Sequence, residues 1–182
     1  MRTLFGEKIF LRALEPADID YLYRLENDEN QWKFSSVSVP FSRNLLENYI
    51  AQSHKDIYEV KQVRLVICEK ESFQAVGLID LYDFDPKNHR VAVGITVYPE
   101  DSRKKGYAFD ALIHLCRYAF KHLNVHQIYA GITADNEPSI RLFERAGFSR
   151  SCRKIDWTYQ DNEFKDEFLY QLFKKDFLKF LK

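Results

Sequence analysis

The chain has 182 residues, of which 46% are hydrophobic and 15% aromatic, and its 27 lysines and arginines balance 27 aspartates and glutamates. This length suits one domain with one substantial core, so we expect residues 1–182 to fold as a single unit. A formal net charge of zero argues against a protein that is drawn to nucleic acid or to a membrane by a global electrostatic field.

The N-terminus and the cysteines bear on cellular location. Charged residues interrupt the opening stretch MRTLFGEKIFLRAL, and no later window holds 18 uninterrupted apolar residues, so neither a secretion signal nor a membrane span is predicted. The cysteines at Cys68, Cys116 and Cys152 form no CxxC pair and are expected to be reduced thiols. The histidines are not spaced as ligands on one face, so no metal site is predicted. These features together predict a cytoplasmic protein.

The first third of the chain predicts a strand followed by two helices. Lys8–Ala13 has the apolar pattern of a strand. Pro16 then opens a helix that we expect to run to about Asn27, because proline suits the first helical turn. The polar stretch NDENQWKFSSVSVPFS indicates a loop, after which Ser42 is expected to cap a second helix through Ile50.

The rest of the chain predicts a mixed sheet of the α/β (α+β) class. Three strands rich in β-branched residues, separated by short polar turns, favour antiparallel pairing. The helix from Tyr107 then joins two strands as a right-handed parallel crossover. The expected strands are Val63–Cys68, Ala75–Leu81, Arg90–Tyr98, Gln127–Thr133, about Phe148–Thr158 and Phe164–Phe173. The expected helices are Tyr107 to about Leu123, Asn136–Ala146 and the terminal stretch KKDFLKFLK.

The segment PEDSRKKGYA, between a strand and a helix, favours anion binding. A helix N-terminus presents unpaired backbone N–H groups and about half a positive charge. Gly106 lets an anion approach the backbone closely, and Arg103, Lys104 and Lys105 add charge beside it. This combination suits a phosphate or pyrophosphate, although three solvated basic side chains in a loop would give the same pattern.

A second motif narrows the choice of anion. The chain has no G-x-x-x-x-G-K-[ST] and no G-x-G-x-x-G, which disfavours the common nucleotide-binding folds. Thirty residues after the basic loop comes NEPSIRLFERAGF, and the two segments together resemble the GNAT superfamily of acetyl-CoA-dependent N-acetyltransferases. The opening KIFLRALEPADIDYLYRLEND resembles the branch that acetylates ribosomal-protein alanine or spermidine. The resemblance implies a GNAT fold, with a mostly antiparallel sheet of six to seven strands and helices on both faces.

The resemblance also implies which residues bind acetyl-CoA. The basic loop corresponds to the pyrophosphate loop of the family, although family members usually have glycine where this chain has Lys104. Asn136 and Ser139 correspond to the cofactor-binding end of the following helix, and an ordinary N-cap is the alternative role of Asn136. The implied cofactor-binding residues are Ile95, Thr96 and Val97 for the pantetheine arm, Arg103, Lys104, Lys105, Gly106, Tyr107 and Ala108 for the pyrophosphate, and Asn136 and Ser139.

The catalytic residues of many family members are missing. Phe143 stands where the resemblance implies a proton-donating tyrosine, and Ala92 stands where it implies a glutamate base. Deprotonation at pH 7 costs about 4.6 kcal/mol for a lysine-like amine and about 1.4 kcal/mol for an α-amine, so a weak base suits the second better. Asp80 is our candidate base, from the cluster DLYDFD that also holds Asp83 and Asp85. Proton transfer through water is equally plausible, and a polar turn is the structural alternative for the cluster.

Two functions remain open on the sequence. The first is transfer of acetyl from acetyl-CoA, by direct attack, to a primary amine, either a protein N-terminus or a small molecule such as a polyamine. The second is a catalytically silent CoA-binding regulatory module, which Ala92 and Phe143 favour. Glu26, Asp28 and Glu29 could attract a basic acceptor or simply be solvated. The aromatic stretch EFLYQLFKKDFLKFL could form a homodimer surface as readily as an internal strand and tail.

Overall fold

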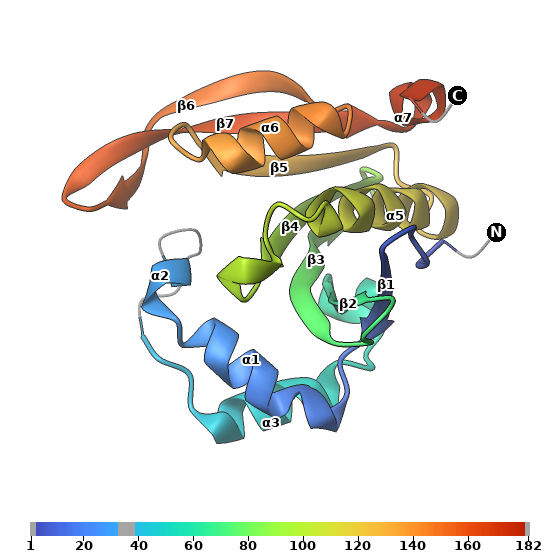
Figure 1. Cartoon of the computed structure of the whole chain (residues 1–182). Coiled ribbons are helices and arrows are strands. Elements are labelled where there is room, and N and C mark those ends of the chain that lie inside the picture. Colours follow the sequence, from blue (N-terminus) through green and yellow to red (C-terminus); the bar gives the residue numbers. More distant parts are fainter. Residues whose placement is uncertain (1–2, 33–38, 181–182) are drawn as a thin grey trace.

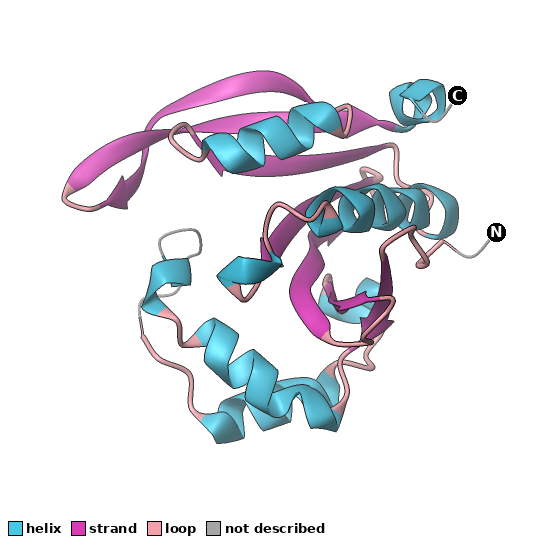
Figure 2. Ribbon diagram, in the orientation of Figure 1, coloured by secondary structure: helices cyan, strands magenta, loops and turns pink. Residues whose placement is uncertain are grey.

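The computed structural model describes residues 3–32 and 39–180 and is built on one seven-stranded sheet of order β1-β2-β3-β4-β5-β7-β6 (Figures 1 and 2). Neighbouring strands are antiparallel except β4 and β5, which are parallel on either side of a helical crossover. The predicted mixed sheet is therefore confirmed. The strands are β1 (Ile9–Ala13), β2 (Val63–Glu69), β3 (Ala75–Asp85), β4 (Arg90–Val97), β5 (Gln127–Thr133), β6 (Ser149–Gln160) and β7 (Glu163–Phe173).

The helices lie close to their predicted positions, with three differences. Pro16–Asp18 is a 3₁₀ turn rather than the first turn of an α-helix, and the expected loop after Asn27 contains the single turn α2. Part of that loop, residues 33–38, lies outside the described residues. The unpredicted α4 is also one turn, too short to show helical periodicity in a sequence. The helices are α1 (Ile19–Glu26), α2 (Glu29–Trp32), α3 (Arg43–Gln52), α4 (Ile57–Val60), α5 (Tyr107–His122), α6 (Glu137–Arg145) and α7 (Lys174–Phe180).

Strand β3 is longer than the sequence predicted. It continues to Asp85, so the segment that could have formed a polar turn is a bulged strand in which Asp83 has a φ of 50°. Phe84 explains the extension, because it is buried and packs edge-on against Tyr58 with ring centroids 5.0 Å apart. The turn begins only at Asp85, whose carboxylate accepts a hydrogen bond of 2.9 Å from the Asn88 amide.

Helices cover both faces of the sheet, as predicted. One face packs against α5, and the larger hydrophobic cluster lies there. On the other face a smaller cluster joins β2 and β3 to α1 and α3. We call these the α5 face and the α1/α3 face. Side chains alternate between them along each strand, so that in β2 Ile67 belongs to the first cluster and Val66 to the second.

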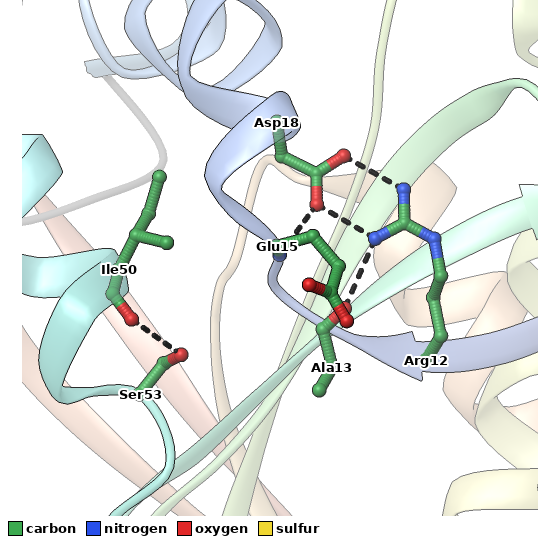
Figure 3. A network of polar contacts seen from close by, with 6 residues as sticks. All are labelled: Arg12, Ala13, Glu15, Asp18, Ile50 and Ser53. Atoms are coloured by element: carbon green, nitrogen blue, oxygen red, sulfur yellow. Dashed lines mark hydrogen bonds and ion pairs between the residues drawn. The ribbon is translucent and has the colours of Figure 1, made fainter.

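A partly buried ion pair joins β1 to the turn that leads into α1 (Figure 3). The Arg12 guanidinium donates two hydrogen bonds to Asp18, of 2.6 and 2.7 Å, and Asp18 also accepts one of 2.8 Å from the Glu15 amide. Burial alone would raise the pKa of Asp18, but these hydrogen bonds outweigh it and hold the pKa below its ordinary value. Because α1 ends at Glu26, this pair also determines where that carboxylate lies.

Strands β4 and β5 separate after a short paired stretch. Their register joins Arg90 to Gln127, Val91 to Ile128 and Ala92 to Tyr129. Beyond Ala92, β4 continues in register with β3 alone, while β5 continues with β7. We call residues 93–97 and 130–133 the β4–β5 divergence; Figure 1 shows the two strands parting there.

Candidate functional site

Both helices that follow the diverging strands begin at the same edge of the sheet. Strand β4 leads through a 3₁₀ turn and the basic loop into α5, and β5 leads directly into α6. Since β4 and β5 are parallel, their carboxyl ends, and hence the two helix N-termini, lie on one side. The β4–β5 divergence therefore opens between two positive helix ends, an arrangement that suits an elongated anionic ligand.

The start of α5 is built for backbone contact with an anion. Gly106 is its N-cap, with a φ of 90° that favours glycine, and it brings no side chain to cover the first-turn amides. Lys104, at the position where family members usually have glycine, also has a positive φ, of 62°. The loop has therefore kept the left-handed conformation without the glycine. Tyr107 is buried, and its hydroxyl donates to Glu69 in β2.

The three basic residues of the loop differ in how they are held. Arg103 is tied down: its guanidinium donates to Glu100 at 2.8 Å and to Gln31 of α2 at 3.3 Å. Lys104 and Lys105 are exposed. The prediction of three solvated basic side chains is thus wrong for Arg103. Lys104 and Lys105 keep their charges at the surface, and the Lys105 ammonium lies 5.9 Å from the centre of the Tyr107 ring.

A fourth cation at this end of α5 was missed by sequence reasoning. The Lys8 ammonium, from the start of β1, donates to the Lys105 carbonyl at 2.9 Å and lies 3.4 Å from the position that a Cβ on Gly106 would occupy. The Lys8 amide donates to Asp110 of α5 at 2.7 Å. Lys8 and Lys105 are 97 residues apart, so no local pattern could have revealed the contact.

Asn136 caps α6. Its side-chain oxygen accepts a hydrogen bond of 3.2 Å from the Ser139 amide, so the N-cap predicted as the alternative role is present. Both residues are partly exposed at the carboxyl end of β5. A cofactor contact through the Asn136 amide nitrogen is compatible with this cap and stays a prediction.

Asp80, the predicted base, is held toward β2. It lies on the α1/α3 face, where it accepts hydrogen bonds from Arg64 of β2 at 2.6 Å and from Gln62 at 3.4 Å. Arg64 also donates to Glu26 at 2.5 Å. Burial opposes the charge of Arg64, but Asp80, Tyr49 and Glu26 outweigh it and raise the pKa of the guanidinium. Glu26, predicted as part of an acidic patch, thus shares the Arg64 guanidinium with Asp80, and the role of Asp80 stays a prediction.

The two unusual catalytic positions are both buried. Ala92 lies in register between Tyr82 of β3 and Tyr129 of β5, at the last pair before the strands separate. Burial raises the pKa of Tyr82 to about 12, so its hydroxyl stays protonated at neutral pH. Phe143 packs edge-on against Phe148, with ring centroids 4.9 Å apart, inside the α5-side core.

Comparison with known proteins agrees with this geometry. Residues 8–149 match the family described as acetyltransferase (GNAT) domain. The chain belongs to the GNAT acetyltransferase family. An uncharacterised N-acetyltransferase, YokL, from Bacillus subtilis is 30% identical over 84% of each chain. The spermidine N(1)-acetyltransferase of Vibrio cholerae is 24% identical over 88% of this chain and 90% of its own.

Solved structures share the GNAT fold. A Vibrio cholerae spermidine N-acetyltransferase crystallised with CoA and spermine superimposes with a TM-score of 0.83 at 21% identity, covering 95% of this chain and 99% of the other. This 182-residue chain is thus an acetyl-CoA-dependent N-acetyltransferase that transfers acetyl to an amine. The predicted fold, cofactor and enzyme class are thereby confirmed.

Two further predictions concern a metal and the membrane. Over residues 3–32 and 39–180, no three histidine, cysteine, aspartate or glutamate side chains converge as metal ligands. In the same ranges, no helix combines the length and the apolar character needed to cross a bilayer. Cys68 and Cys116 are buried free thiols and Cys152 is an exposed one.

Proposed function

We propose that this GNAT enzyme holds the CoA diphosphate at the start of α5 and the pantetheine arm in the β4–β5 divergence. The open first-turn amides at Gly106, Tyr107 and Ala108 and the exposed lysines of the loop support the first part. The unpaired side of β4 supports the second, because an extended arm can add to a strand edge. The proposed cofactor residues are Ile95, Thr96, Val97, Arg103, Lys104, Lys105, Gly106, Tyr107, Ala108, Asn136 and Ser139.

The proposed acceptor is a small polycationic amine of the polyamine class. Carboxylates on the α1/α3 face support it, because Glu26 and Asp80 share a single guanidinium and leave an excess negative charge beside the divergence. Spermidine acetyltransferases among the relatives point the same way. A protein N-terminus is the other acceptor that the sequence predicts.

One observation carries the proposal: two helices begin at the carboxyl ends of two parallel strands that separate. Calorimetric titration with CoA tests the binding part, and exothermic one-to-one binding with thermal protection is expected. The chemical part is tested by free-thiol release from acetyl-CoA with spermidine, a diamine and an alanine-starting peptide. Binding without thiol release on any amine would favour the silent module, whereas absence of binding would remove the cofactor site itself.

Self-association and location stay predictions. The stretch predicted as a dimer surface or as an internal strand and tail forms the internal strand β7 and helix α7 over residues 167–180, and the dimer surface stays a prediction. Exposed aromatic side chains also lie along the β6–β7 hairpin, at Trp157, Tyr159 and Phe164, and they support the proposal of a homodimer. Light scattering of the purified chain would measure it. Cytoplasmic location is proposed on the sequence alone.

A further inference from the structure

Each of the two diverging strands carries one glycine on the α1/α3 face, and a polar side chain from the next strand lies over each. In β4 the glycine is Gly94, where an added Cβ would lie 3.5 Å from the Tyr82 ring of β3. In β5 it is Gly131, where an added Cβ would lie 2.7 Å from Oε1 and 3.0 Å from Oε2 of Glu167. The Glu167 carboxylate therefore lies directly over the β5 backbone at Gly131, one of the residues of the β4–β5 divergence.

The sheet register explains why Glu167 reaches this place. In β7 it pairs with Thr133 of β5, so its side chain is on the same face as Gly131 and Tyr129. Because Gly131 has no side chain, the Glu167 carboxylate has room to lie over the β5 backbone. Only 19% of the Glu167 side chain is exposed, and its charge is among the causes that raise the pKa of Tyr82, after burial, Asp83 and Tyr129. Glu167 and Tyr82 thus flank the divergence from opposite sides.

The Glu167 carboxylate already forms an ion pair with an alkyl ammonium. Lys154 of β6 places its Nζ 2.6 Å from Glu167 Oε1 and 4.5 Å from the centre of the Trp157 ring. A primary ammonium therefore fits between the carboxylate and an aromatic face, which is the chemistry of an amine-binding site. An acceptor ammonium would take the place of Lys154.

Glu167 is better placed than Asp80 to serve the reaction. The Asp80 carboxylate is held by Arg64 of β2 and by Gln62, which precedes β2. It therefore lies on the side of β3 that is away from the divergence. Apart from its chain neighbours, only Tyr82 among the described residues comes within 4 Å of a Cβ on Gly94. The Asp80 carboxylate is thus outside that range although the two residues are paired in register.

We propose that Glu167 is the carboxylate that binds the acceptor ammonium and takes its proton; this inference rests on the proposed function. The carboxylate removes one proton from R–NH3⁺, and the neutral nitrogen attacks the thioester carbon with its lone pair. The C–S bond breaks, the sulfur leaves with the electron pair, and it takes the second nitrogen-bound proton. Glu167 then returns its proton to water. A carboxylate from β7 thereby supplies the base that Ala92 cannot provide.

The test measures kcat and KM at saturating acetyl-CoA for the wild type, Glu167→Gln, Lys154→Met and the hairpin control Glu163→Gln. Spermidine is the cationic acceptor, and an arylamine that is uncharged at pH 7 is the second. Glu167→Gln is expected to lower kcat/KM for spermidine about 100-fold or more, as loss of a general base does, and to affect the arylamine far less. Lys154→Met frees the carboxylate and is expected to lower the spermidine KM several-fold, whereas Glu163→Gln leaves both parameters within 2-fold, an estimate in line with substitutions remote from a site.

A second variant guards against a folding defect. Gly131→Ala keeps Glu167 ionised but displaces its carboxylate, because the new Cβ would lie 2.7 Å from Oε1. The same selective loss for spermidine, with CoA affinity retained, is expected. Equal losses for both amines, or spermidine turnover by Glu167→Gln close to that of the wild type, would overturn the role of Glu167 and leave the proposed function intact. A wild-type enzyme that binds CoA but acetylates no amine would overturn both.

Discussion

The two sides of the β4–β5 divergence are built in different ways. On the α5 side, most of the groups that face the proposed diphosphate are main-chain amides of one continuous segment, residues 103–108, and the Lys8 ammonium joins them from beside β1. On the α1/α3 face, the polar groups come from separate strands, with Tyr82 on β3 and Glu167 on β7. A site made of backbone amides depends little on the neighbouring side chains, whereas a site made of side chains depends on sheet register.

The strongest test of the backbone site is Gly106→Val. Its φ of 90° disfavours a β-branched residue. We expect CoA affinity to fall at least about 100-fold, or about 2.7 kcal/mol, in calorimetric titration. Gly147→Val is the matched control, because Gly147 has a φ of 89° and ends α6 instead of starting α5. Both variants should lose about 2 kcal/mol of unfolding free energy, and comparable CoA affinities would count against the backbone site.

The other side depends on the ion pair that orients α1. Asp18 is 6% exposed and pairs with a partly exposed Arg12, so Asp18→Ala should lower the unfolding free energy by about 1–3 kcal/mol. The exposed pair of Asp20 with Arg43 is the comparison, and Asp20→Ala should cost much less stability than Asp18→Ala, because solvent screens an exposed pair. Because α1 carries Glu26, the acceptor KM should change more than the acetyl-CoA KM in Asp18→Ala. Equal shifts in both constants would mean that α1 serves neither side specifically.

The same pair gives the fold an acid sensitivity. The pKa of Asp18 is lowered from 3.8 in the folded state, because hydrogen bonds from Arg12 and Glu15 outweigh the opposing effect of burial. A lowered folded pKa contributes stability above the unfolded pKa, and that contribution is lost as the pH falls through the folded value. Urea unfolding from pH 7 to pH 3 should therefore show a smaller loss for Asp18→Asn than for the wild type. Parallel curves would contradict this.

Two substitutions of Asn136 can distinguish its capping of α6 from its proposed contact with the cofactor. Asn136→Ala removes the hydrogen bond to the Ser139 amide and should lower the unfolding free energy by about 1 kcal/mol. Asn136→Ser keeps a capping oxygen but lacks the amide nitrogen. If the side chain also binds CoA, the serine variant should retain stability and lose about 3–10-fold in CoA affinity, the effect of one hydrogen bond. Unchanged CoA affinity in Asn136→Ser would mean that Asn136 only caps α6.

The smallest expected effect concerns Lys104. Its φ of 62° suits glycine, so Lys104→Gly should relieve strain of about 1 kcal/mol, partly offset by the greater freedom of the unfolded chain. Stability should therefore change by less than about 1 kcal/mol in chemical denaturation. CoA affinity should fall by less than about 3-fold and become less dependent on salt, because one cation is lost and the amides remain. A large loss would show that the α5 side relies on charge rather than on its backbone.

Local patterns were sufficient for much of the fold and for one side of the site. Alternating and helical periodicities placed the strands and the longer helices, and the glycine after the basic run marked the start of α5. They were insufficient for α4, which is a single turn, and for the end of β3, where burial of Phe84 extends the strand through polar residues. Periodicity needs several residues to show itself, and tertiary packing can override it.

The amino-acid sequence by itself determined the order of the strands and the longer helices, the GNAT family and the contiguous basic loop before α5, because these depend on residues that are neighbours in the chain. Only the tertiary structure decided that Lys8 reaches Gly106, that Asp80 turns toward Arg64 and that Glu167 lies over Gly131. Those contacts join residues 16 to about 100 positions apart, or lie across two strands, and they depend on register and on which face a side chain takes. A one-residue shift of a strand would turn its side chains to the other face of the sheet, and these contacts would be lost.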